Sequence, residues 1–137
     1  MKRAVRLEHC FGCGPKNPIG LKLEFWWEDR EYVTSFTPHP EHQSYPGVVH
    51  GGLTATVLDE TMGRMLFELY GGARTAELTV RYLAPVSPGQ TTSCRAWIER
   101  QKGRAVFTGA VLAGGGTELA RALGTYIIKG EIQDATE

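Results

Sequence analysis

The chain has 137 residues, 42% of them apolar and 22% charged, which is the composition of a globular domain rather than of a disordered chain. Fifteen basic residues balance fifteen acidic ones, so the charge favours neither nucleic acid nor a membrane surface as a partner. The sequence contains no run of about 18 apolar residues and no signal-peptide pattern, so we expect a cytoplasmic protein.

The first part of the chain predicts an irregular segment, a hairpin and a long loop. Residues 1–19 are expected to be irregular, because this segment is rich in glycine and proline. Apolar and polar residues alternate over 21–27, a turn follows at 28–30, and 32–36 has the pattern of a returning strand. Residues 37–50 include three prolines, and a connection of this length inside a domain is often functional.

Helical periodicity begins at Gly51 and continues to about Tyr70, where the glycine pair that follows is expected to end the helix. An apolar stripe on this helix is expected to face the core, and it consists of Leu58, Met62, Met65, Leu66 and Leu69. The other side carries charged residues that we expect to pair with one another in water, namely Glu60, Arg64 and Glu68.

Four strand-like segments follow the helix, at residues 75–83, 90–101, 104–113 and 117–129. Turns that contain glycine or proline separate them, and a short hairpin turn is expected at Lys102-Gly103. A single long helix among antiparallel strands has to cover one face of the sheet, which predicts an α+β fold. Because the sequence has no repeat and no linker, we expect residues 1–137 to form a single domain.

The start of the helix is the first candidate for chemistry, because Gly51 and Gly52 open it directly after a loop. The N–H groups of a first helical turn are free to bind an oxygen that carries negative charge, and the helix dipole strengthens this binding. A glycine also lets a ligand approach the backbone closely. The alternative is that the two glycines only permit a tight turn.

Asp59 is the second candidate, because it lies beside the apolar stripe and burying an unpaired carboxylate is costly. The alternative is a solvated aspartate at the edge of the stripe. The neighbouring Glu60 belongs to the charged side instead. His50 could act as a general base, but no serine or cysteine nucleophile stands at a recognisable spacing from it, so we favour a positioning role.

The three cysteines do not form an evident site, since an odd number argues against a disulfide framework. Cys10 and Cys13 form a C-x-x-C pair, but the sequence shows neither the second ligand pair of a zinc site nor the βαβ unit of a redox motif. Cys94 stands in an apolar context. We therefore expect no metal and no cofactor, with metal binding or redox chemistry at the pair as the lesser alternative.

Together, these residues resemble a known family. His-Gly-Gly followed by an aspartate nine residues after the histidine, on a long helix, resembles the hotdog-fold acyl-CoA thioesterases, in particular the phenylacetyl-CoA thioesterase type. Further resemblances are spread over most of the chain, from residue 10 to residue 127, namely CFGCGPKNPIGLKL (residues 10–23), TAELTVRYLAPV (75–86) and GTYI (124–127).

The resemblance implies a curved antiparallel sheet wrapped around one long central helix, in a homodimer or homotetramer with active sites between subunits. It implies hydrolysis of an acyl-CoA thioester to a free acid and CoA. The Gly51 N–H polarises the thioester carbonyl, and Asp59 of the facing subunit acts as nucleophile or as general base on water. The sequence does not decide between these two mechanisms.

The resemblance also suggests residues that bind the substrate, with His50 and Gly52 beside the carbonyl donor. Gln43 falls near a position where relatives often carry asparagine or another polar residue. Thr75 falls where some relatives have a serine or threonine that helps to hold the water or the carboxylate of the site. Arg104, beside Arg100 in a basic hairpin, is a candidate for the CoA phosphates. The alternatives are an ordinary strand threonine and a solvated basic hairpin.

Two other functions stay open at this stage. One is a non-catalytic hotdog protein that binds acyl-CoA in the same cleft. The other is an enoyl-CoA hydratase of the same fold; those enzymes carry a histidine a few residues after their aspartate, whereas here His50 precedes Asp59.

Overall fold

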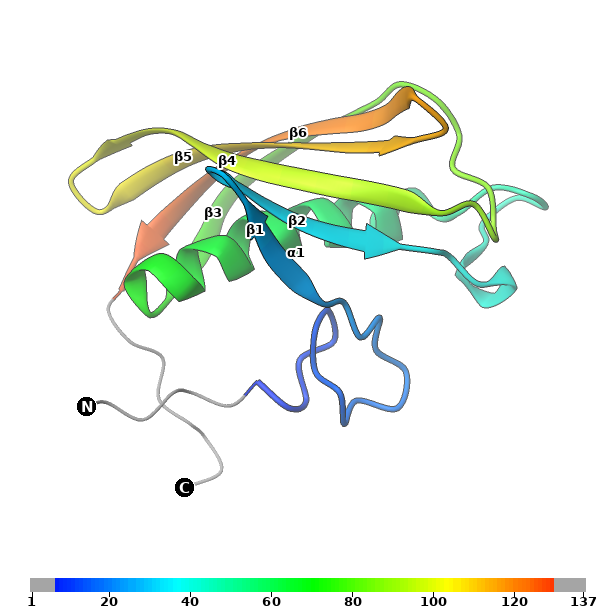
Figure 1. Cartoon of the computed structure of the whole chain (residues 1–137), viewed down its shortest axis with the longest axis horizontal. Coiled ribbons are helices and arrows are strands. Elements are labelled where there is room, and N and C mark those ends of the chain that lie inside the picture. Colours follow the sequence, from blue (N-terminus) through cyan, green and yellow to red (C-terminus); the bar gives the residue numbers. More distant parts are fainter. Residues whose placement is uncertain (1–6, 130–137) are drawn as a thin grey trace.

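A computed structural model describes residues 7–129. Six antiparallel strands form one sheet in the order β1-β2-β4-β5-β6-β3, and the single long helix α1 packs against one of its faces (Figure 1). In chain order the elements are β1 (Phe25–Glu28), β2 (Glu31–Phe36), a 3-10 helix (Pro40–His42), α1 (Gly51–Tyr70), β3 (Ala73–Tyr82), β4 (Thr92–Lys102), β5 (Ala105–Gly114) and β6 (Thr117–Ile128).

The strands after the helix confirm the sequence prediction, with ends that differ by no more than two residues. The hairpin turn between β4 and β5 lies at Gly103-Arg104, one residue later than expected. The first strand is shorter than predicted and begins at Phe25. The residues before it bond to the N-terminal segment instead, because the Leu21 N–H donates to the Phe11 carbonyl at 2.8 Å.

The helix has the predicted bounds, and Gly71 ends it in the left-handed conformation at φ 83°. Four members of the predicted stripe are buried against the sheet, at 1% exposure or less, namely Leu58, Met62, Met65 and Leu66. The prediction is wrong for Leu69, which is 48% exposed. This residue lies in the last turn, where it lines an open hollow with Trp27 of β1 and Trp97 of β4 instead of being enclosed in the core.

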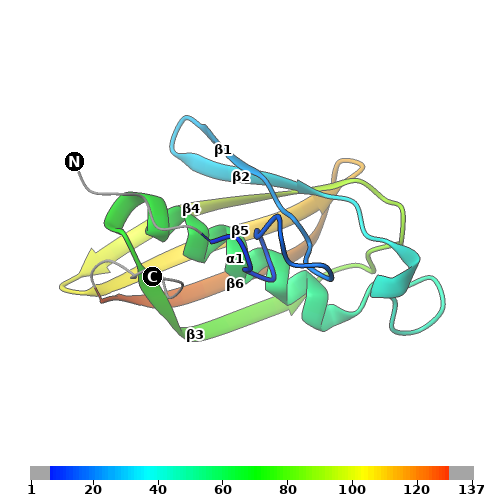
Figure 2. The same ribbon diagram turned by 90° about the horizontal axis from the view of Figure 1, so that it is seen from below.

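The charged side of α1 is not open to solvent along its whole length, because the N-terminal segment lies against it (Figure 2). Glu60 is half-buried there, which corrects the expectation that it is solvated. The predicted i,i+4 pair forms between Arg64 and Glu68 at 4.0 Å. Glu68 also accepts a hydrogen bond from the hydroxyl of the buried Tyr32 on β2.

The edges of the sheet differ in length. β1 closes one edge with four residues, whereas β3 forms the other with ten residues that pair on one side with β6. Most side chains of β3 are exposed, and Tyr82 near its end is 54% exposed. A long, exposed edge strand is a template for pairing with another chain. Within residues 7–129, no helix combines the length and apolarity needed to cross a membrane.

Candidate functional site

Asp59 lies in the middle of α1, half-buried, on the side that faces β3 and β6. Two hydroxyl groups donate to the same carboxylate oxygen, Oδ1. The Tyr126 hydroxyl lies 2.6 Å from it and the Thr75 hydroxyl 2.9 Å. Hydrogen bonds to a charged acceptor are short and strong, so this carboxylate is held in one orientation. The sequence leaves open whether Thr75 holds the water or the carboxylate of the candidate site, and in the structure its hydroxyl contacts the carboxylate.

The pairing of β3 with β6 places both donors side by side at Asp59. Thr75 and Tyr126 are direct partners across β3 and β6, and the register shifts immediately afterwards, between Thr75 and Glu77. Such bulges re-aim side chains and are common beside active sites. Gly124, two residues before the tyrosine, leaves the space that its ring needs, because a Cβ there would lie 2.6 Å from the ring.

Tyr126 is the residue that sequence reasoning missed. It is 1% exposed, and burial together with the facing Asp59 carboxylate raises the pKa of its phenol far above the usual range. The hydroxyl therefore stays protonated and acts as a donor. The available signal was the pattern Gly-x-Tyr in a strand, which on its own has many structural explanations.

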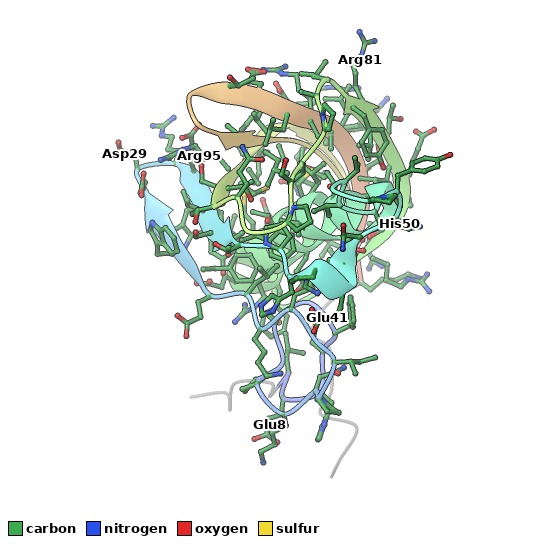
Figure 3. The ribbon with its side chains drawn as sticks, turned by 90° about the vertical axis from the view of Figure 1, so that its right-hand side faces the viewer. Glu8, Asp29, Glu41, His50, Arg81 and Arg95 are labelled. Carbon is green, nitrogen blue, oxygen red and sulfur yellow. The ribbon has the colours of Figure 1, made fainter. Side chains whose placement is uncertain are left out.

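The helix start forms the other half of the candidate site. His50 is the N-cap residue, and its Nδ1 accepts the Gly52 N–H at 2.9 Å. It lies where the connection from β2 enters α1 (Figure 3). The Leu53 N–H donates to the His50 carbonyl at 3.0 Å. Within residues 7–129 the Gly51 N–H has no hydrogen-bond acceptor, so this donor of the first helical turn is free to bind a ligand.

His50 should therefore contribute to stability as a cap. We expect His50→Ala to lower the free energy of unfolding by about 1 kcal/mol, because the Gly52 N–H loses its acceptor. His50→Asn should recover most of this loss, since asparagine is among the best N-cap residues. Urea denaturation of the three proteins measures the difference. Equal stability of the alanine and asparagine variants would contradict the capping role.

A mostly apolar cleft of about 410 Å³ opens beside Gly51. Tyr82 forms one wall, and its hydroxyl donates to the Gly51 carbonyl at 2.8 Å. A Cβ added at Gly51 would lie 3.4 Å from the Tyr82 ring, which is ordinary contact. Tyr45 and Leu83 line the cleft and are 79% and 47% exposed. This end of the helix is therefore accessible to an apolar group.

The remaining candidates lie further from the carboxylate. Gln43 uses both ends of its amide within its own loop, because Oε1 accepts the Gly47 N–H at 2.6 Å and Nε2 donates to the Pro40 carbonyl at 2.8 Å. Arg104 is exposed in the β4–β5 turn, two residues before Val106, which pairs with Tyr126. Arg100 stacks its guanidinium on Phe107, with 3.9 Å to the ring centroid.

Cys94 does not supply a nucleophile. It lies fully buried in the core, and burial raises the pKa of its thiol to about 12. A reactive cysteine needs access and a thiolate, and this residue has neither.

The Gly51 N–H and the Asp59 carboxylate are too far apart to act together within one chain. Eight residues of helix separate them, which corresponds to about 12 Å along the axis. A donor and a base that act on one carbonyl must each lie about 3 Å from the reacting atoms. Within one chain, therefore, these two groups cannot act on the same carbonyl.

The family model described as "Thioesterase superfamily" matches residues 46–120, which include Gly51, Asp59 and Thr75. A curated relative is the acyl-coenzyme A thioesterase THEM4 of Xenopus laevis, 40% identical over 80 residues. These residues are 58% of this chain and 36% of the relative, so the match spans about a third of the relative's length.

Solved structures share the fold. A thioesterase superfamily protein superimposes with a TM-score of 0.82 at 21% identity, over 93% of this chain and 67% of that one. A hypothetical thioesterase from Streptococcus pneumoniae TIGR4, solved with coenzyme A, gives 0.74 at 18% identity, over 80% and 90% of the two chains. These likenesses confirm the expected fold, a curved sheet around one long helix.

Variants of the Streptococcus pneumoniae protein have also been crystallised. In one an aspartate is replaced by alanine, and in another a threonine, and the two positions are separated by 16 residues. Asp59 and Thr75, joined by a hydrogen bond, have the same separation of 16 in this chain.

Proposed function

The chain belongs to the thioesterase superfamily, and we propose that it hydrolyses an acyl-CoA thioester to a free carboxylic acid and CoA. The observation that carries this proposal is the arrangement around Asp59, where two hydroxyl donors, Tyr126 and Thr75, hold one oxygen of a half-buried carboxylate. A fully buried structural aspartate would need donors for both of its oxygens. Within residues 7–129, Oδ2 has no donor, which leaves it available to a reactant.

The proposed chemistry divides between the two halves of the site. The Gly51 N–H donates to the thioester carbonyl oxygen and stabilises the negative charge that develops there, an effect worth about 2.7–4 kcal/mol for one well-placed donor. Asp59 either removes a proton from the attacking water or attacks the carbonyl carbon itself. As a base, Asp59 takes the proton of the water whose oxygen attacks the carbonyl carbon; as a nucleophile, it forms a mixed anhydride that water then hydrolyses. In both routes the C–S bond breaks, CoA leaves as the thiolate, and one water is consumed for each acid released.

The complete site requires a second copy of the chain, because about 12 Å of helix separates the two groups in one copy. We propose that copies pair along the exposed edge strand β3, which carries Thr75 at one end and Tyr82 at the other. A dimer of this kind places the Asp59 of one copy opposite the Gly51 of the other. A tetramer of two such dimers is the other assembly that we expect.

The remaining residues bind and position the substrate in this proposal. His50 and Gly52 shape the helix start, and Gln43 holds the loop in front of it. The cleft at Gly51 accepts part of the substrate, and Arg104 binds a CoA phosphate from the β4–β5 turn. The phenylacetyl-CoA type of substrate, the single-domain organisation and a cytoplasmic location stay predictions.

The test is steady-state hydrolysis of a panel of short, long and aromatic acyl-CoA substrates, with the released thiol detected by a chromogenic reagent. We expect saturable thiol release with at least one class of acyl group. Tight binding of acyl-CoA in calorimetry without any thiol release would favour a non-catalytic binding protein. An enoyl-CoA added to the panel tests the third function, because loss of its enoyl absorbance without thiol release would favour a hydratase.

Tyr126→Phe tests how the carboxylate is positioned. We expect kcat to fall while KM changes little, because the phenol touches Asp59 and not the substrate. The free energy of unfolding should fall by about 1.5–3 kcal/mol, the usual contribution of a hydrogen bond to a charged group.

Tyr32→Phe is the matched control, since this equally buried tyrosine donates to Glu68 on another side of α1. It should lower stability and leave kcat unchanged. If both variants lose the same fraction of kcat, the Tyr126 hydroxyl has no positioning role.

A further inference from the structure

The N-terminal segment, residues 7–24, lies on the side of α1 that faces away from the sheet, as Figures 1 and 2 show from two directions. There it brings the Sγ atoms of Cys10 and Cys13 to the carboxylate of Glu60. The three potential ligand atoms all lie within 4.8 Å of one another, and the three side chains are half-buried. None of them takes part in the proposed thioester chemistry, so the cluster calls for a separate explanation.

The backbone of the segment is shaped around the glutamate. A Cβ at Gly12, between the two cysteines, would lie 2.4 Å from Cδ of Glu60, so the glycine leaves the carboxylate the place that it occupies. A Cβ at Gly14 would lie 2.3 Å from the backbone nitrogen of Cys10, so only glycine fits at that position. The Gly14 N–H donates to the Cys10 carbonyl at 2.8 Å and closes the C-x-x-C turn. The Leu23 N–H donates to the Gly12 carbonyl at 2.9 Å and ties the turn to the next part of the segment. Both thiols are therefore presented to the carboxylate by a fixed backbone.

The distance between one thiol and the carboxylate matches that in a metal site. Cys10 Sγ lies 3.5 Å from Oε2 of Glu60. In a tetrahedral site with Zn–S bonds of about 2.3 Å and Zn–O bonds of about 2.0 Å, the edge between sulfur and oxygen is about 3.5 Å. A metal ion can therefore replace the thiol proton between these atoms with little movement. Two thiolates and a carboxylate favour zinc, whereas calcium and magnesium prefer oxygen ligands alone.

We propose that Cys10, Cys13 and Glu60 bind a divalent cation of the zinc class, with water in the fourth position. The ion fastens the N-terminal segment to α1 at the residue next to Asp59. The expectation of no metal rested on the absence of a second pair of cysteine or histidine ligands. The third ligand comes instead from the helix, 50 residues after Cys10, a separation that no ligand-spacing pattern contains. This proposal does not depend on thioesterase activity.

The experiment is a titration of the reduced, metal-free full chain with Co²⁺, whose charge-transfer absorption reports thiolate ligands. We expect one Co²⁺ to bind per chain with this absorption, and Zn²⁺ to displace it. The double variant Cys10→Ser/Cys13→Ser should lose the absorption. Glu60→Gln should raise the Kd for Co²⁺ by at least about 10–100-fold, because this is the usual loss when a residue that only hydrogen-bonds to a metal ligand is removed.

Two matched controls should bind Co²⁺ as the wild type does. Cys94→Ala removes the buried cysteine of the core, and Glu24→Gln removes an exposed carboxylate of the same segment. Circular dichroism of the metal-free proteins shows which variants are folded. Absence of charge-transfer absorption at saturating Co²⁺ in the wild type, or a wild-type Kd in Glu60→Gln, would overturn the proposal. Air oxidation to a Cys10–Cys13 disulfide, with no metal uptake by the reduced chain, would identify a redox pair instead.

Discussion

Replacing Asp59 with asparagine is expected to lower kcat for acyl-CoA hydrolysis by about 100- to 10,000-fold, the usual contribution of a carboxylate that transfers a proton. The amide cannot take a proton from water and is a poor nucleophile. Its oxygen still accepts the hydrogen bonds from Tyr126 and Thr75, so the local structure should persist. Steady-state kinetics with the best substrate of the panel measures the loss, and urea denaturation shows that the variant is folded.

Asp29→Asn is the matched control for this substitution. Asp29 lies exposed in the turn between β1 and β2 with a positive φ of 57°, a conformation that asparagine adopts readily. The control should keep the kcat of the wild type. An Asp59→Asn variant with an unchanged kcat would remove Asp59 from the reaction, even if the chain proves to be a thioesterase.

The elements of the fold were predictable because each carries a local signal. The helix combines an apolar stripe with two glycines at its start and Gly71 at its end, and every feature concerns residues close in sequence. The position of Asp59 beside the buried stripe followed from the same periodicity. The helical periodicity also predicted that Asp59 and Glu60 lie on different sides of the helix. In the structure Asp59 faces β6 and Glu60 faces Cys10.

What the sequence left open depends on contacts between distant segments. Tyr126 reaches Asp59 beside Thr75 because β6 pairs with β3 in one register, which no local pattern specifies. Glu60 looked solvated because no periodic pattern predicts where an irregular segment such as residues 7–24 will pack. The cluster of Cys10, Cys13 and Glu60 was not predictable for the same reason, since its side chains come from a loop and a helix that only the tertiary fold brings together.

The role of Gly51 can be tested without losing the helix start. Gly51→Pro removes the N–H group, and proline is well tolerated at the first position of a helix, where its missing donor has no intrahelical partner. The preceding residue, His50, has ψ 130°, within the range of about 120–160° that a residue before proline adopts. We expect kcat to fall by about 100- to 1,000-fold, the cost of removing one oxyanion donor.

Gly51→Ala separates the loss of the donor from the effect of added bulk. Alanine keeps the N–H group but adds a Cβ, which would lie 3.4 Å from the Tyr82 ring. Proline adds a Cβ at the same place, so the two variants share this added bulk. If the N–H polarises the carbonyl, Gly51→Pro must lose far more kcat than Gly51→Ala while both unfold at similar urea concentrations. Equal losses in the two variants would mean that glycine serves there to admit the substrate, and the oxyanion would need another donor.

Mixing the Gly51→Pro and Asp59→Asn proteins extends the test to the assembly. In a mixed dimer, one of the two shared sites combines the unchanged Gly51 of one copy with the unchanged Asp59 of the other. If the site is shared by two copies, the mixture should therefore regain activity that neither variant has alone.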